Sequence, residues 1–394
     1  MSDEIQFKLK AFLKKIGLPI LLLTILIVPL FIGHFVNTNV KATLYAFSLS
    51  MKSVLLFVLP ILIFSFIFSS LLNLKSGALR YILLLVGMIY VSNCIAIFLG
   101  FGVGKVVLPS LHINMFEPIT GAVLKPMWEF DLPKWISNQY ALIIGFIFGL
   151  TFSYYRVARV DRFAEKLHAI AMGFLKKIFM PLLPLFILGF VFKLEHDHLL
   201  ATALTVYGPV CLIVVSTQIC YMLFLYLVVS KFSIKKCYGY LRNVFPATIM
   251  GFSTLSSAAT MPLLILCSEK NIESPTIPES VIPATINTHT LGSALAITLL
   301  SLTTLMAFGY PLPTFAEFAQ FGFFYALAKF AVAAVPGGAI IVVTPLLETY
   351  MHFSGEMVGL IAAIYMLFDP FGTATNVTGN GCFAIAFSKL YKVE

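Results

Sequence analysis

A series of apolar segments, each long enough to cross a lipid bilayer, constrains this chain more than any other feature of its sequence. The segments lie at about 17–36, 44–73, 80–107, 138–155, 165–192, 201–230, 280–307 and 356–391. A helix of roughly 20 apolar residues crosses the hydrocarbon core of a bilayer. Only 11% of the residues are charged, against about 25% in soluble domains. The sequence therefore predicts an all-α polytopic membrane protein with eight transmembrane helices.

The basic residues of the loops predict how these helices are oriented. Lys and Arg are concentrated on the side that carries both ends of the chain, as in the N-terminal run Lys8, Lys10, Lys14 and Lys15. Cytoplasmic loops of membrane proteins carry this excess, so we expect both termini in the cytoplasm. No small-residue cleavage site follows the first apolar segment, and we expect no cleaved signal peptide. The net charge of +9 lies in these loops and indicates no nucleic-acid partner.

Two further apolar segments, at about 244–268 and 330–353, carry small polar or helix-breaking residues at their centres. The first contains Ser256 and Ser257, and the second contains Val335, Pro336 and Gly337. If either segment crossed the membrane, these residues would leave backbone groups without partners in lipid. We therefore predict two re-entrant helical hairpins, each made of two short helices that meet at a protein-sheltered tip.

Each predicted hairpin precedes a long apolar segment with a polar interruption, at 283–290 and at 373–380. We expect a broken helix at both places. Around the second interruption, Asp369, Thr373, Asn376 and Asn380 are spaced by three or four residues and share one face of a helix. Polar groups at this depth are costly unless they face partners or a water-filled site. Interrupted segments at corresponding positions of two halves indicate inverted repeats around a central transport site.

These motifs resemble the glutamate transporter homologue family, the dicarboxylate or amino acid:cation symporters. The resemblance covers nearly the whole chain, and the runs that carry it are Ser256-Ser257 with Thr260-Met261-Pro262, Ala284-Thr285-Ile286-Asn287, Val335-Pro336-Gly337 and Asn376-Val377-Thr378-Gly379. It implies an elevator-type transporter, a homotrimer and a bacterial inner-membrane location. It also implies a single membrane domain over 1–394, with a scaffold at about 12–73 and 138–192 and a mobile transport core at about 80–107 and 201–391.

The resemblance also implies which residues bind the substrate. They are Ser256, Ser257, Val335, Pro336, Gly337, Asp369, Gly372, Thr373 and Asn376. Asp369 would hold the α-amino group of the solute, Ser257 and Asn376 would hold its α-carboxylate, and the run around Pro336 would form an outer gate. Dicarboxylate members carry an Arg where this chain has Gly372, so an acidic side chain of the solute would lack its partner. We therefore expect a solute that is not acidic.

A second set of residues is implied as cation-binding. It consists of Ser92, Asn93, Thr285, Asn287, Thr288, Asn376 and Asn380. Two Asp residues of the family's sodium sites are replaced here, by Asn380 and within the run that contains His289. Sodium and a proton both stay open as the coupling ion. His289, which titrates near neutral pH when unperturbed, and Asp369 are candidate proton carriers. The scattered cysteines give no C-x-x-C pair, so we expect no transition metal and no other cofactor.

The sequence thus predicts a cation-coupled secondary active transporter of a small organic solute, which is expected to be an amino acid, and not an enzyme. Two alternatives stay open: an uncoupled or channel-like relative, and a membrane-embedded hydrolase that uses Ser253 and His289. Single residues have alternatives too. Asp369 could cap a helix break at Pro370, and His289 could be a satisfied buried imidazole. We expect Lys329 and Glu348, which border the second hairpin, at the membrane interface.

Overall fold

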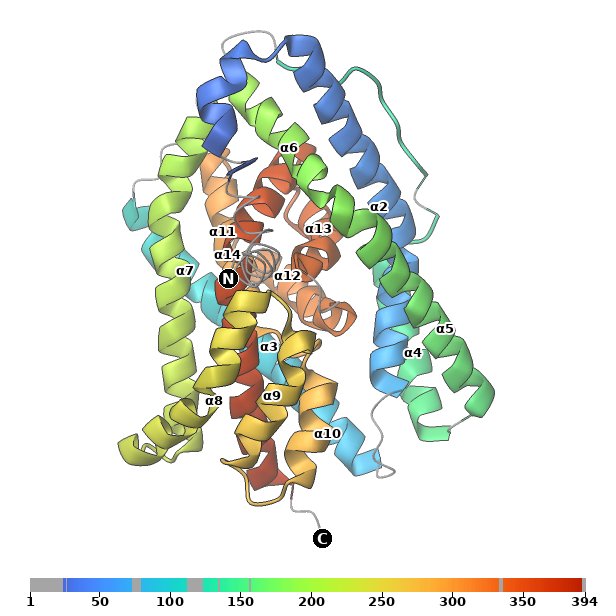
Figure 1. Ribbon diagram of the computed structural model, residues 1–394, viewed down its shortest axis with the longest axis vertical. Helices are drawn as coiled ribbons and strands as arrows, with labels where there is room; N and C mark the ends of the chain where they lie inside the picture. Colours follow the sequence, from blue (N-terminus) through green and yellow to red (C-terminus); the bar gives the residue numbers. More distant parts are fainter. Residues whose placement is uncertain are drawn as a thin grey trace, which may run out of the picture.

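The computed structural model describes residues 24–25, 27–72, 79–111, 123–133, 135–155, 157–332 and 336–391. All regular structure among these residues is helical (Figure 1). The α-helices are α2 (Thr38–Leu72), α3 (Leu79–Val107), α4 (Asn138–Tyr155), α5 (Ala158–Phe174), α6 (Met180–His196), α7 (Leu200–Val229), α8 (Ile234–Thr254), α9 (Ser257–Glu269), α10 (Thr276–Thr285), α11 (Leu291–Ala307), α12 (Phe315–Ala328), α13 (Gly338–Tyr350) and α14 (Gly355–Leu390). Of the first predicted span, about 17–36, residues 17–23 and 26 lie outside the described residues.

Four described helices are long and apolar enough to cross a membrane. They are Thr38–Leu72, Arg80–Leu111, Leu200–Val229 and Gly355–Leu390. The segment predicted as one span at 165–192 is a pair of helices, α5 and α6, bent by 53°. A π-helical turn, Leu175–Phe179, and two prolines at the start of α6 explain the bend, because proline removes a backbone donor. The polytopic all-α class agrees with these helices, and the total of eight spans stays a prediction.

The helices form two groups (Figure 1). In one group, α2 packs against α4, α5 and α6. In the other, α11 and α14 pack against each other, and α3, α7 and α8 surround them. Nearly every residue of α11 is buried, and so is most of α14. The polar residues singled out by their spacing therefore lie at the centre of the second group and do not face lipid.

Two helix–turn–helix units begin earlier than the sequence predicts. The first, α8 and α9, starts at Ile234 instead of about 244, because the basic start of α8 does not read as apolar. Its turn contains Leu255 in the left-handed conformation, and the Ser256 side chain accepts a bond from the first turn of α9. The second, α12 and α13, starts at Phe315 instead of about 330, where a Thr314–Glu317 capping box begins α12. That capping box is visible in the sequence.

Only one of the two expected broken helices is broken. The backbone leaves the helical conformation between Thr285 and Leu291, as predicted. The prediction of a second break at 373–380 is wrong, because α14 is continuous from Gly355 to Leu390 and includes Pro370. The polar side chains there form hydrogen bonds in addition to the backbone hydrogen bonds of the helix. For example, the Thr378 hydroxyl donates to the Ala374 carbonyl at 2.8 Å. Asp369 therefore does not cap a helix break at Pro370.

Candidate functional site

A small polar pocket lies where the turn between α8 and α9, the break between α10 and α11, and the middle of α14 meet. Its lining residues are Leu255, Ser257, Ile286, Asn287, Thr290, Ser293, Val332, Ala339, Tyr365, Asp369, Thr373 and Asn376. Four predicted substrate-binding residues line it together: Ser257, Asp369, Thr373 and Asn376. The cavity volume is about 30 Å³, which is enough for a few water molecules. A larger solute therefore requires part of the wall to move.

Asp369 is the one charged residue among the described residues that line the pocket. Its carboxylate is 6% exposed. Oδ2 accepts the backbone N–H of Gly337 at 2.9 Å, and Oδ1 accepts the Tyr365 hydroxyl at 3.1 Å. Gly337 is the N-cap of α13 and has φ +72°, a conformation that favours glycine. The carboxylate therefore holds the tip of the α12–α13 unit against α14.

Asn376 lies two turns after Asp369 on α14 and faces the first turn of α11. Its Oδ1 accepts the backbone N–H groups of Gly292 at 2.8 Å and Ser293 at 3.4 Å. The first N–H groups of a helix have no partner within the helix, so this bond caps α11. It also fixes the carboxamide with its oxygen toward α11, which leaves the Nδ2 end for other contacts.

Two buried polar atoms in the pocket wall have no hydrogen-bond partner among the described residues. They are Asn287 Oδ1 and Thr290 Oγ1, both in the break between α10 and α11. Buried polar atoms in proteins nearly always have a partner. The break therefore offers one acceptor oxygen and one hydroxyl to a bound solute or water.

The predicted cation-binding residues lie together, on the side of the break that faces α3. Ser92 Oγ lies 2.8 Å from His289 Nε2, and His289 Nδ1 lies 3.0 Å from Asn380 Oδ1. Both ring nitrogens of His289 thus have partners, as in the satisfied-imidazole interpretation. The roles of His289 and Asp369 as proton carriers stay predictions.

Three other members of this set, Asn93, Thr285 and Thr288, also bond to protein groups, whereas Asn287 Oδ1 has no partner among the described residues. Asn93 donates to the Thr288 carbonyl at 2.8 Å and accepts the Thr290 N–H at 3.3 Å. The hydroxyls of Thr285 and Thr288 donate back to the turn before them, to Val281 at 3.0 Å and to Ala284 at 2.9 Å. The bonds of Asn93 tie α3 to the helix break and engage the Thr288 carbonyl and Asn93 Oδ1 as acceptors. The Thr hydroxyls donate in their bonds, so their oxygens keep free lone pairs.

Several predicted substrate-binding residues lie outside the pocket lining. Ser256 caps α9, and Pro336 and Gly337 form the tip behind the wall. Gly372 lies where α11 and α14 cross, since a Cβ on Gly292 would collide with its carbonyl oxygen. Val335 lies outside the described residues. The close crossing requires the glycine at Gly292, because a Cβ on Gly372 itself would meet its nearest atom, Ser293 N, at an ordinary 3.8 Å. Gly372 brings no side chain to the pocket.

The sequence interpretation missed three residues of the site. The prediction that Lys329 is interfacial is wrong: its side chain is fully buried, and Nζ lies 2.8 Å from Ser293 Oγ. Tyr365 contacts Asp369, and Gln218 donates to the Gly292 carbonyl at 2.9 Å. A lone lysine in an apolar run was the available signal, because ionisable residues at membrane depth are functional by default. Glu348 lies near the surface and pairs with Lys52 at 2.6 Å.

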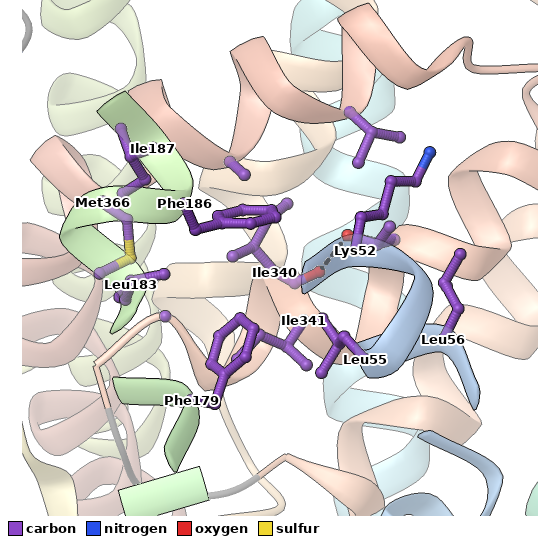
Figure 2. Close-up of a pocket in the computed structure, with 14 residues that line it drawn as sticks. Lys52, Leu55, Leu56, Phe179, Leu183, Phe186, Ile187, Ile340, Ile341 and Met366 are labelled. Carbon is purple, nitrogen blue, oxygen red and sulfur yellow. Dashed lines mark hydrogen bonds between the residues drawn. The ribbon is translucent and has the colours of Figure 1, made fainter. Parts of the chain in front are cut away.

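An apolar cavity lies behind the tip of the α12–α13 unit, on the side away from Asp369. Figure 2 shows Phe186 and Leu183 of α6, Leu55 of α2 and Ile340 of α13 around it. Gly337 lies between this cavity and the polar pocket, since it lines the cavity and its N–H donates to Asp369. The cavity is too apolar for a polar solute, and its volume of about 20 Å³ leaves little free space behind the tip.

A third cavity reaches the polar pocket from the end of α2. Its volume is about 710 Å³, and its lining includes Ser69, Tyr81 and Glu279. It shares Ile286 and Asn287 with the polar pocket. The two cavities are therefore neighbours at the α10–α11 break, and the tip of the α12–α13 unit borders the polar pocket through the bond of Gly337 to Asp369.

Comparison with known proteins identifies the kind of protein that carries this site. The sequence matches the sodium:dicarboxylate symporter family over residues 18–390. The chain belongs to this family. The symporter is also 30% identical over 149 residues to an excitatory amino acid transporter of Onchocerca volvulus, an alignment that covers 37% of this chain and 30% of the relative. The chain therefore spans less than a third of that relative in the alignment.

Membership confirms the predictions of a membrane symporter and of a protein that is not an enzyme. The hydrolase alternative also lacks a dyad in the structure. The Ser253 hydroxyl donates to the Ile249 carbonyl at 2.9 Å. His289, in turn, bonds Ser92 and Asn380. The chain is therefore a member of a symporter family, and its transport activity, solute and coupling ion are matters for proposal.

Proposed function

We propose that this symporter carries a small neutral amino acid and binds it in the polar pocket between α9, the α10–α11 break and α14. One observation carries the proposal: the described lining holds a single charge, the carboxylate of Asp369, and no basic residue. An ammonium group satisfies that carboxylate. A second carboxylate on the solute would find no positive partner among the lining residues, at a cost of several kcal/mol, because the Lys329 ammonium behind the wall is already bonded to Thr290 and Ser293.

The α-carboxylate of the amino acid has its own candidate partners. Ser257 is the first residue of α9, a helix of 13 residues, and it lines the pocket. The N-terminus of a helix favours anions because its first N–H groups lack partners and its dipole is positive there. The Nδ2 end of Asn376 is the second donor. The solute would therefore span the pocket from Asp369 to Ser257 and Asn376.

Binding and gating are then linked through Asp369. The carboxylate now accepts the N–H of Gly337 in the tip of the α12–α13 unit. The enclosed space is too small for an amino acid, so the tip has to move before the solute enters. The elevator-type movement, the homotrimer, the scaffold and transport-core boundaries, and the placement of both termini in the cytoplasm of a bacterial inner membrane belong to this proposal.

Uptake into proteoliposomes tests the proposed solute class. We expect labelled neutral amino acids such as alanine, serine or leucine to accumulate, and aspartate and glutamate to be taken up at least about tenfold more slowly, because one uncompensated charge costs more than 1.4 kcal/mol. The vesicles carry imposed sodium or proton gradients, and vesicles without protein give the background. Faster uptake of aspartate or glutamate than of any neutral amino acid contradicts the proposal. Uptake that follows the solute gradient alone supports the uncoupled alternative.

Gly337→Ala tests the role of the tip. An alanine there would adopt an unfavourable φ of +72°, and its Cβ would lie 2.6 Å from Met366 Sδ. We expect uptake to fall several-fold and the melting temperature to drop, in line with a strain of about 1–3 kcal/mol. Gly208→Ala is the matched control, since a Cβ on Gly208 meets no atom within 4 Å. Equal uptake by both variants would remove Gly337 from the gate.

A further inference from the structure

The ammonium of Lys329 is buried among oxygen atoms and an aromatic face in the centre of the second helix group. Nζ donates to Ser293 Oγ at 2.8 Å and to the Thr290 carbonyl at 3.2 Å. It also lies 4.6 Å from the centre of the Tyr325 ring, within the range of a cation–π contact. The three N–H directions of the ammonium thus point to two oxygens and one ring. Backbone carbonyls at a helix break are also the groups that bind cations in transporters of this architecture.

Lys329 forms no ion pair with any described carboxylate. Its partner Ser293 lines the same pocket as Asp369, whose Oδ1 accepts the Tyr365 hydroxyl at 3.1 Å. The other titratable groups around Lys329 are Tyr325 of α12 and His289 of the break. A buried charge requires compensation. Asp369 is the carboxylate of the neighbouring pocket that supplies this compensation without any added ion.

A sodium ion does not fit the residues predicted to bind it. Asn380 and His289 bring no negative charge and bond each other at 3.0 Å. The Thr288 carbonyl and the Asn93 side chain bond each other, and the Thr290 carbonyl accepts from Lys329. Asn287 Oδ1 has no partner among the described residues, but it brings no charge. A sodium ion held by the other residues would compete with these bonds and would add a second positive charge beside Lys329. With one carboxylate among the described pocket residues, that charge would have no partner.

We propose that the Lys329 ammonium is a covalently tethered cation that takes the place of a bound sodium ion beside the solute pocket, so that this symporter binds its amino acid without sodium. The inference rests on the proposed function for the identity of the solute, but its central claim concerns the ion alone. Of the two coupling ions that the sequence leaves open, it selects the proton.

The ion can be tested on the purified protein without any solute. The melting temperature is measured as sodium chloride replaces choline chloride at constant ionic strength. A ligand that binds the folded state raises the melting temperature as its concentration passes its dissociation constant. We expect no rise that is specific to sodium. A saturable sodium-specific rise in the wild-type protein overturns the proposal, whatever solute the protein carries.

The role of Lys329 is tested with solute in both salts. Lys329→Met keeps the length of the side chain and removes its charge, and Lys235→Met removes an exposed lysine as the control. We expect wild type and control to bind the best neutral amino acid equally, within about twofold, in sodium and in choline. Lys329→Met should bind at least about tenfold more weakly in choline, because Thr290 and Ser293 of the pocket wall lose the cation that holds them in place.

The outcomes separate this inference from the proposed function. Unchanged binding by Lys329→Met in choline overturns the inference, and so does wild-type binding that requires sodium. If Lys329→Met does not fold, the wild-type comparison of sodium with choline still decides. If no neutral amino acid binds in either salt, the proposed solute class fails, and the solute-free sodium titration still decides the role of Lys329.

Discussion

Asp369→Asn is expected to abolish uptake of the neutral amino acid while the protein still folds. The amide keeps the shape of the carboxylate, and its oxygen can still accept the N–H of Gly337. It cannot compensate the charge of a buried ammonium group. Removing one partner of a buried charge pair costs about 3–5 kcal/mol, which corresponds to a loss of roughly a hundredfold or more in solute affinity. Initial uptake rates and solute-induced thermal shifts measure the effect.

Glu273→Gln is the control for this variant, because it neutralises an exposed carboxylate in a loop. It should transport like the wild type. Wild-type uptake by Asp369→Asn would show that the carboxylate does not hold the amino group, and the proposed binding mode would then be wrong. Loss of uptake together with loss of the folded protein would instead show a structural role at the tip of the α12–α13 unit.

The largest effect on stability is expected for Gly292→Ala. Gly292 lies in the first turn of α11, where α14 approaches most closely. An added Cβ would collide with the Gly372 carbonyl oxygen and lie 2.7 Å from the Thr375 Cβ. Backbone on both sides prevents relief by a rotamer change, so we expect a loss of at least about 3 kcal/mol. The collision would also displace the N–H groups that Asn376 caps.

The thermal stability of purified Gly292→Ala, with Gly102→Ala beside it, measures this effect. A Cβ on Gly102 meets no atom within 4 Å, so that control should melt like the wild type. A Gly292→Ala variant that is equally stable and transports normally would mean that α11 and α14 do not cross at Gly292 and Gly372. The positions of Asn376 and Ser293 in the pocket would then also be wrong.

Much of the pocket follows from sequence because its residues are close together along the chain. Asp369, Thr373 and Asn376 repeat at helical spacing, so any continuous helix brings them to one face. The polar run between Pro283 and Thr290 likewise predicts a helix break, and the structure has it. Patterns of this kind depend on local backbone geometry alone.

The rest of the site depends on contacts between distant segments. The partners of Lys329 lie 36 and 39 residues before it, so no local pattern reveals that its ammonium is satisfied inside the protein. The polar run at 373–380 looks like the one at 283–290, yet α14 stays helical. Sequence cannot tell whether such side chains bond their own helix, cap another helix, or replace backbone bonds. The hydrogen bonds of Asn376 depend on the position of α11, whose Gly292 and Ser293 N–H groups are its partners.

The most direct measurement is a cryo-electron microscopy map of the symporter with the neutral amino acid that it takes up fastest. The account predicts the solute ammonium about 3 Å from the Asp369 carboxylate, as in a charge-assisted hydrogen bond, and the solute carboxylate against Ser257 and Asn376. The tip that contains Gly337 should then have moved from its bond to Asp369. A map with the amino acid bound elsewhere, and with Asp369 still bonded to Gly337, would contradict the account.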